Sequence, residues 1–175
     1  RMSPGRHGIY IRDKYWKQGK PCPVAVVVGQ DPLLYMVSGL EVPHGLGEYD
    51  YAGGIRNEPY DVVPGPITKL PLPATAEIAF EAEMVQGDVS PEGPFGEWTG
   101  YYALHGPQPV IVVKSVLHRD DPILLGAMPA KPPTPSPVFP IRGAVTIWDK
   151  LETAGVSGVK GVWQLEAGGT HFIPV

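Results

Sequence analysis

The chain has 175 residues and carries 14 Lys and Arg against 18 Asp and Glu, for a net charge of −4. Its basic residues form no stripe, which argues against a nucleic-acid-binding protein. No apolar run is long enough to span a bilayer, and the first residues lack the apolar core of a signal peptide. With Cys22 as the only cysteine, no intramolecular disulfide forms. These features predict a soluble, cytoplasmic protein with a buried structural thiol and no membrane partner.

The first half of the chain is expected to alternate short helices and strands. Helical spacing of the apolar residues predicts a helix over residues 7–17. The apolar, β-branched run over residues 23–28 is typical of a strand buried on both faces. Asp31-Pro32 then predicts the start of a short helix, because proline fits the first helical turn. A second short helix is expected to begin near Glu48.

The second half reads mainly as strands. Apolar and acidic residues alternate over residues 77–85, which predicts a half-buried strand. The proline-rich run KPPTPSPVFP, residues 131–140, predicts an extended connector. The other expected elements are extended segments over 60–63 and 67–72, strands over 109–117, 122–128, 161–165 and 170–175, and a helix over 142–154. Gly and Pro number 22 each and separate these runs, as expected of a barrel or sandwich with many turns.

One loop stands out for its chemistry. The run PEGPFGEWTG places Glu92 and Glu97 five residues apart. Pro94 fixes its own φ, while Gly93 and Gly96 can adopt backbone angles closed to other residues and let a ligand approach the main chain. This arrangement suits a paired acid and base. A polar turn with solvated glutamates is the alternative interpretation.

Extended to residue 102, the same stretch, PEGPFGEWTGYY, resembles the hallmark loop of the UbiD family of carboxy-lyases, which are decarboxylases that use prenylated FMN. Other stretches match in the same order: PVAVVVGQDP, VPHGLGEYDYAGGIRNEP, LPLPATAEIAFEAE, VKSVLHRDDPI and GVKGVWQLEAGGTHF. Together they cover nearly the whole chain. The resemblance implies an α+β, mainly β fold, namely a split β-barrel FMN-binding domain with short peripheral helices. It further implies that residues 1–175 are this single domain, as a fragment of a longer enzyme.

The resemblance also implies a cofactor site. His7 and Glu48 match the family's metal-binding histidine and glutamate, which hold a divalent ion, usually Mn²⁺, against the flavin phosphate. Arg6 precedes His7 at a helix start, where unpaired N–H groups attract anions. Binding of K⁺, another family feature, would use Glu48 and the main-chain carbonyls around Ser38, Gly39 and Leu40. The family's asparagine ligand lies upstream of residue 1, so this chain alone is expected to bind manganese weakly.

Glu92 and Glu97 match two members of the family's Glu-Arg-Glu catalytic set. The resemblance implies that Glu97 donates a proton and that Glu92 pairs with an upstream arginine, which orients the substrate carboxylate. The implied reaction is the reversible decarboxylation of an aromatic or α,β-unsaturated carboxylic acid. The implied partners are that small-molecule acid and a flavin prenyltransferase that supplies the cofactor. The parent enzyme is expected to be a homo-oligomer.

Two other functions stay open. One is a non-catalytic flavin-binding or accessory barrel, in which the pocket persists without chemistry. The other is an interaction module that presents residues 131–140 as a polyproline ligand. The aromatic residues Trp98, Tyr101 and Tyr102 are expected to pack in the core, with a position lining the flavin or substrate cleft as the alternative.

Overall fold

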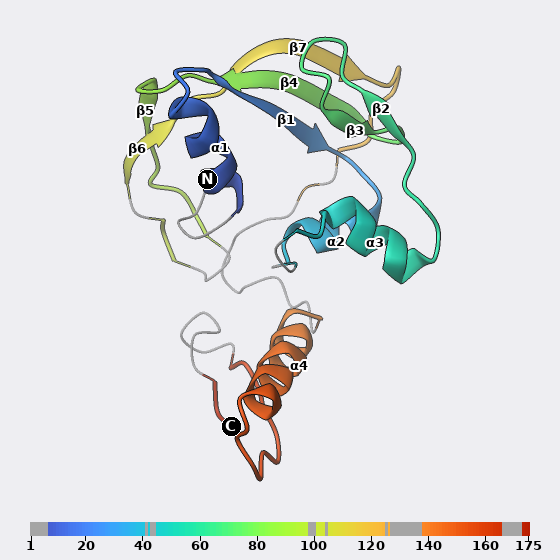
Figure 1. Ribbon diagram of the computed structural model, residues 1–175, viewed down its shortest axis with the longest axis vertical. Helices are drawn as coiled ribbons and strands as arrows, with labels where there is room; N and C mark the ends of the chain where they lie inside the picture. Colours follow the sequence, from blue (N-terminus) through green and yellow to red (C-terminus); the bar gives the residue numbers. More distant parts are fainter. Residues whose placement is uncertain are drawn as a thin grey trace. The chain divides into compact units, whose positions relative to one another are not determined.

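The fold was analysed in a computed structural model of the chain (Figure 1). The residues that it describes are 7–40, 42, 45–97, 101–103, 105–124, 126, 138–165 and 173–175, without the side chains of 138–140 and 142. The chain divides into two compact units. The first comprises residues 1–90 and 107–126, and the second comprises residues 91–106 and 127–175.

The first unit is built on a three-stranded antiparallel sheet in the order β1-β4-β7 (Figure 1). Its strands are β1 (Cys22–Val28), β4 (Ile78–Met84) and β7 (Val112–His118). The central strand β4 contributes buried residues on both of its faces, with Ala79 and Ala82 among them. A register shift between Glu81 and Ala82 interrupts the pairing with β7. Such irregularities bend a strand locally and re-aim its side chains.

Helix α1 (His7–Trp16) packs beside this sheet. The indole nitrogen Nε1 of Trp16 donates a hydrogen bond to the carbonyl oxygen of Met84 at 3.0 Å. The guanidinium of Arg12 lies 4.4 Å from the centre of the Trp16 ring, within the range of a cation–π contact. Cys22, at the start of β1, is buried, and this burial raises the pKa of its thiol although the nearby charge of Arg12 opposes the shift.

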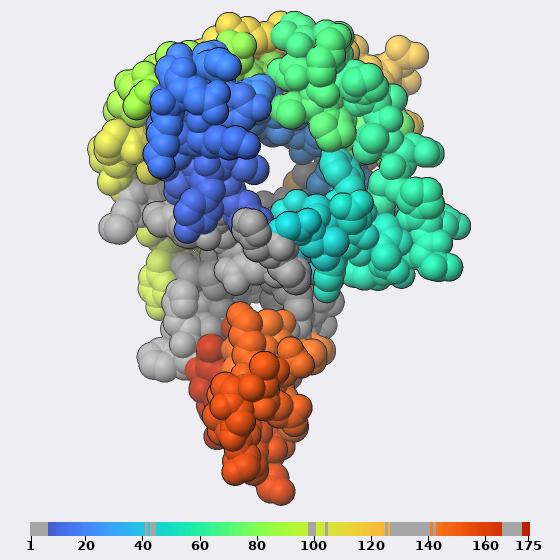
Figure 2. All heavy atoms as spheres, in the orientation of Figure 1, coloured from blue at the N-terminus to red at the C-terminus, as the bar shows by residue number. Residues whose placement is uncertain are grey.

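Two short helices, α2 (Pro32–Ser38) and α3 (Glu48–Arg56), pack against each other in the same unit. Asp31 caps α2 by accepting hydrogen bonds from the first N–H groups of the helix, as expected before a proline-led helix. The pair encloses a buried apolar cluster of Leu34, Val37, Val42 and Ala52, against which Leu33, Leu40, Tyr49 and Tyr60 pack. In the space-filling view, α1 and α3 both lie at the surface (Figure 2).

The remaining strands form two small two-stranded sheets. Strand β2 (Val62–Pro64) pairs antiparallel with β3 (Pro71–Pro73). The turn that joins them supplies hydrogen bonds to Glu81, a carboxylate of β4 with no exposed surface. Strand β5 (Val89–Glu92) pairs with β6 (Gly106–Pro109).

The second unit contains helix α4 (Val138–Thr153). Its buried Ala144 belongs to the apolar lining of a groove of about 460 Å³, together with the buried Val162. The main-chain N–H of Trp163 donates to the carbonyl of Pro174 at 3.2 Å, so the two segments lie side by side. No helix among the described residues is both long enough and apolar enough to cross a membrane.

Most of the expected elements are confirmed. The mixture of helix and strand agrees with the sequence, and the confirmed segments are the four helices and the strands at 23–28 and 77–85. The strand expected at 109–117 is confirmed from Val112 on, as β7, whereas Pro109 ends β6. No closed barrel is present among the described residues. The extended segments at 60–63 and 67–72 correspond to the short β2–β3 hairpin.

Other expectations are wrong. Only Cys22 of β1 is buried, because the remaining strand residues are half-buried instead of covered on both faces. Helix α4 begins at Val138, inside the expected connector, whose residues 131–137 lie outside the described ranges. Residues 161–165 form no strand, and neither do 122–124. Most of the expected strand at 170–175 and the rest of 122–128, apart from residue 126, also lie outside the described part.

Candidate functional site

The structure brings two predicted cofactor-binding segments to one pair of helices. Ser38 is the last residue of α2, and Gly39 and Leu40 form the turn that ends it through N–H bonds to Met36 (3.2 Å) and Val37 (2.8 Å). Glu48 is the first residue of α3. Leu40 and Tyr49, the neighbour of Glu48, pack against the same buried cluster. The end of α2 and the start of α3 are therefore both held by packing against this cluster.

The chemistry of these two helix ends suits a bound cation in different ways. The carbonyl groups at the C-terminal end of α2 carry the negative end of the helix dipole. Glu48 is exposed, and its carboxylate adds a full negative charge at the start of α3. Burial raises the pKa of the neighbouring Tyr49, and the charge of Glu48 adds to this shift.

The predicted metal ligands do not make a complete site by themselves. His7 begins α1 and is exposed, while Arg6 lies outside the described residues. Throughout the described ranges, no group of three His, Cys, Asp or Glu side chains is close enough to hold a metal ion. A divalent ion needs more ligands than an imidazole and a carboxylate. These side chains therefore fit a metal only if a bound phosphate or further chain supplies the remaining ligands.

Glu92 and Glu97 lie in the second unit, on a shaped loop. Glu92 is the last residue of β5, and the loop turns at Gly93, whose φ of +83° favours glycine. After Pro94, a short hairpin begins, in which the N–H of Glu97 donates to the carbonyl of Tyr101 at 2.8 Å. Both glutamates are half-buried. The backbone thus holds Glu97 at a defined position, as expected from the Gly/Pro pattern.

The aromatic residues after this loop do not pack as expected. Tyr101 and Tyr102 are 57% and 79% exposed, so neither belongs to a core. Tyr102 instead forms a bridge with Gly96 across the short hairpin. Trp98 lies outside the described residues.

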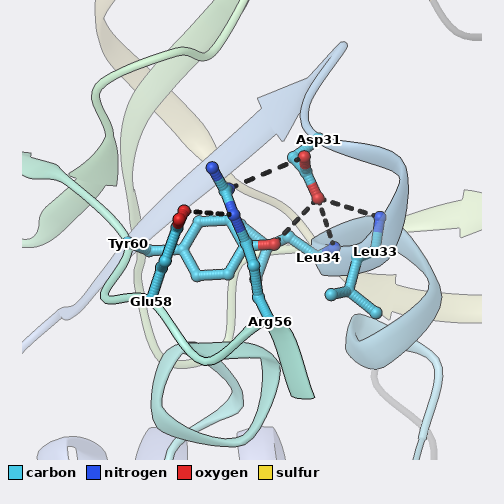
Figure 3. A network of polar contacts seen from close by, with 6 residues as sticks. All are labelled: Asp31, Leu33, Leu34, Arg56, Glu58 and Tyr60. Carbon is cyan, nitrogen blue, oxygen red and sulfur yellow. Dashed lines mark hydrogen bonds and ion pairs between the residues drawn. The ribbon is translucent and has the colours of Figure 1, made fainter. Parts of the chain in front are cut away.

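Sequence reasoning missed a polar network that joins α2 to α3 (Figure 3). The hydroxyl of Tyr60 donates to Oδ1 of Asp31 at 2.8 Å, and Nη1 of Arg56 lies 3.9 Å from Oδ2. The Tyr60 bond lowers the pKa of Asp31; partial burial opposes this, and the N–H groups of Leu34 and Leu33 add to it. The position of Asp31 directly before a proline predicts the helix cap. No local sequence pattern predicts its contacts with Arg56 and Tyr60.

Comparisons with known proteins identify the family of the chain. The family described as "UbiD: 3-octaprenyl-4-hydroxybenzoate carboxy-lyase Rift-related domain" matches residues 1–132. A pyrrole-2-carboxylic acid decarboxylase from Pseudomonas aeruginosa is 35% identical over 131 residues, which are 74% of this chain and 26% of that protein.

Solved structures extend the similarity over nearly the whole chain. The UbiD-class enzyme HmfF from Pelotomaculum thermopropionicum, in complex with FMN, is 27% identical with a TM-score of 0.83; the alignment covers 98% of this chain and 38% of that one. An evolved dimeric form of the same enzyme, in complex with prFMN, gives 26% identity and a TM-score of 0.82 over 98% and 40% of the two chains. The chain thus spans well under half the length of these relatives. It belongs to the UbiD family of carboxy-lyases.

Proposed function

We propose that this chain is the flavin-binding part of a longer decarboxylase that acts on an aromatic or α,β-unsaturated carboxylic acid. The observation that carries the proposal is the extent of the family match, because residues 1–132 include every candidate site residue. The curated relative is named for a heteroaromatic acid, which agrees with this class of substrate. Solved relatives are bound to FMN and to prFMN, and these complexes support a prenylated flavin as the cofactor.

In this proposal, residues 1–175 form one FMN-binding domain of split-barrel type. His7 and Glu48 would hold a divalent ion such as Mn²⁺ against the flavin phosphate, with Arg6 beside them. Glu48 and the turn at Ser38, Gly39 and Leu40 would bind K⁺. The carbonyl-bearing end of α2 and the acidic start of α3 support the cation assignments.

The loop glutamates would act on the substrate. Glu97, held by its main-chain bond to Tyr101, would donate the proton that replaces the lost carboxyl group. Glu92, at the end of β5, would pair with an arginine from elsewhere in the full protein and so orient the substrate carboxylate. The prenylated flavin would supply the covalent chemistry. We further propose a cytoplasmic homo-oligomer that receives its cofactor from a flavin prenyltransferase.

The test is Glu97→Gln in the full-length protein, because this change keeps the shape of the side chain but removes its acidic proton. Decarboxylation of a panel of aromatic and acrylic acids should fall by roughly 100-fold or more, the usual contribution of a general acid. Flavin retention after desalting, measured by absorbance, should stay unchanged. Unchanged turnover of an accepted substrate would refute the proton-donor role.

An accessory flavin-binding barrel without catalysis is the second candidate. It would need the flavin pocket but not the loop glutamates. The two functions differ in one measurement, since the accessory domain would retain flavin and turn over none of the acids in the panel.

A further inference from the structure

The network of Asp31, Arg56 and Tyr60 shown in Figure 3 lies at one end of the α2–α3 pair, and Ser38 and Glu48 lie at the other. Asp31 precedes α2, while Ser38 ends it. Arg56 ends α3, while Glu48 begins it. Helices of 7 and 9 residues span about 10 and 13 Å. The network therefore acts on these residues through the two helices and the apolar cluster between them.

Several contacts fix Tyr60 and Arg56 in place. The guanidinium of Arg56 lies 5.1 Å from the centre of the Tyr60 ring, and its Nε lies 3.3 Å from Oε2 of Glu58. The Tyr60 ring also packs against the buried cluster between the helices. Its hydroxyl reaches Asp31 from this supported position. One carboxylate thus joins the first turn of α2 to the last residue of α3 and to the segment that follows.

The cluster between the helices transmits this constraint. Leu34 and Val37 of α2 and Ala52 of α3 are buried in it, with at most 4% of their surface exposed. Close-packed side chains of this kind move together because they leave no space for independent shifts. Leu40 and Tyr49 rest on the same cluster. A shift of α2 at Asp31 would therefore displace the turn at Leu40 relative to Glu48.

We propose that Asp31, Arg56 and Tyr60 are positioning residues whose contacts set the spacing between the Ser38–Leu40 turn and Glu48. This inference rests on the proposed function in one respect, namely that Glu48 binds the divalent ion with His7 and also binds K⁺ with the Ser38–Leu40 turn. The hydrogen bonds and ion pairs that the structure describes for this network involve neither the turn nor Glu48. Networks of this kind orient the residues that bind a metal or cofactor, and so change the affinity of the site, without contacting the metal or cofactor themselves.

The test compares two variants of the full-length protein. Tyr60→Phe removes the hydroxyl that donates to Asp31 and keeps the ring on the cluster. Thr68→Ala removes a hydroxyl that donates to Glu81 at the same distance, 2.8 Å, in the β2–β3 turn. Both variants lose one hydrogen bond to a carboxylate. Thr68→Ala also loses the bond that its hydroxyl accepts from the N–H of Leu70 at 3.3 Å, so it controls for a general loss of stability.

The first measurement needs no metal or flavin. Hydrogen exchange of the peptide that contains the Gly39 and Leu40 amides should be about fivefold faster in Tyr60→Phe, the effect of one hydrogen bond lost at the partly exposed carboxylate of Asp31, and unchanged in Thr68→Ala. Equal exchange in Tyr60→Phe and the parent protein would overturn the proposal, because the network would then not reach the far end of α2.

The second measurement is Mn²⁺ affinity in the presence of FMN, followed by the electron paramagnetic resonance of the free ion. Tyr60→Phe should bind about fivefold more weakly than Thr68→Ala. Equal affinities would overturn the positioning role even if exchange is faster. If the parent protein binds no Mn²⁺ with FMN, the proposed cation site fails, and with it the positioning role; the exchange result then still decides whether the network fixes the helix ends.

Discussion

Glu81 accepts two hydrogen bonds from Thr68, one from the main-chain N–H at 2.7 Å and one from the hydroxyl at 2.8 Å. The N–H of Ile67 donates to the same carboxylate at 3.1 Å. Burial alone would raise the pKa of Glu81, but these bonds outweigh it and hold the pKa below its ordinary value. The β2–β3 turn is thereby attached to the central strand of the sheet through one buried carboxylate.

Thr68→Ala should reduce the free energy of unfolding by about 2 kcal/mol, because a hydrogen bond to a charged acceptor is lost. Urea denaturation followed by tryptophan fluorescence measures the change. Lys114→Gln is the control, since it removes an exposed ion pair with Glu83 and should cost well under about 1 kcal/mol. A loss in Thr68→Ala no larger than in this control would contradict the attachment of the turn.

Gly29→Ala should destabilise the protein by more than about 2 kcal/mol. Gly29 has a φ of +71°, and an added Cβ would lie 2.5 Å from the carbonyl oxygen of Ile123 and 2.6 Å from Cβ of Glu77. Gly87→Ala is the matched control, because its φ is +84° but nothing lies within 4 Å of the added atom. The control should cost only about 1–2 kcal/mol, the backbone term. Equal losses in urea unfolding would show that the close contacts relax freely.

Stability should fall as the pH drops through the acid range. Asp31 has a pKa below its ordinary value of 3.8, and Glu81 has a pKa below its ordinary value of 4.5. Both carboxylates therefore stabilise the fold fully above these values, and the stabilisation is lost as they are protonated at lower pH. Thermal unfolding between pH 6 and about pH 2.5, a range that brackets these values, should show this loss. Tyr60→Phe should make the loss smaller, because it removes the largest cause of the Asp31 shift.

His7→Ala and Glu48→Gln should each weaken Mn²⁺ binding to the full-length protein with FMN by at least about tenfold, since the loss of a supporting group alone costs that much. Isothermal titration calorimetry measures the affinity. His105→Ala, a change of another exposed histidine, should leave it unchanged. Parent-like affinity in both of the first two variants would remove these residues from the metal site.

The elements that local signals determine were predictable from the sequence. The start of α2 follows from Asp31-Pro32, because a side-chain cap and a proline act within one turn. Glu81 shows the limit of such reasoning. The alternating pattern predicts an acidic residue on a half-buried strand, yet its hydrogen-bond donors lie 13 and 14 residues away and bury it completely. Only the fold brings those donors to it.

The same distinction holds for the candidate site. Ser38, Gly39, Leu40 and Glu48 came from the family resemblance, and the structure adds that they occupy adjoining ends of two packed helices. No periodicity links Asp31 to Tyr60, because their contact depends on how α3 returns alongside α2. Residues 161–165 form no strand although the N–H of Trp163 donates to the carbonyl of Pro174, because a strand needs a ladder of such bonds.

Because Cys22 is buried, its reactivity reports local opening of the sheet at the start of β1. Cys22 is the only thiol of the 175 residues, and it lies 2% exposed at the start of β1 opposite Met84. Burial also keeps the thiol in its unreactive protonated form. A thiol reagent added to the native protein can therefore react only when this end of the sheet separates. At a reagent concentration where labelling outpaces reclosing, the rate of labelling would equal the rate of opening, without any engineered probe.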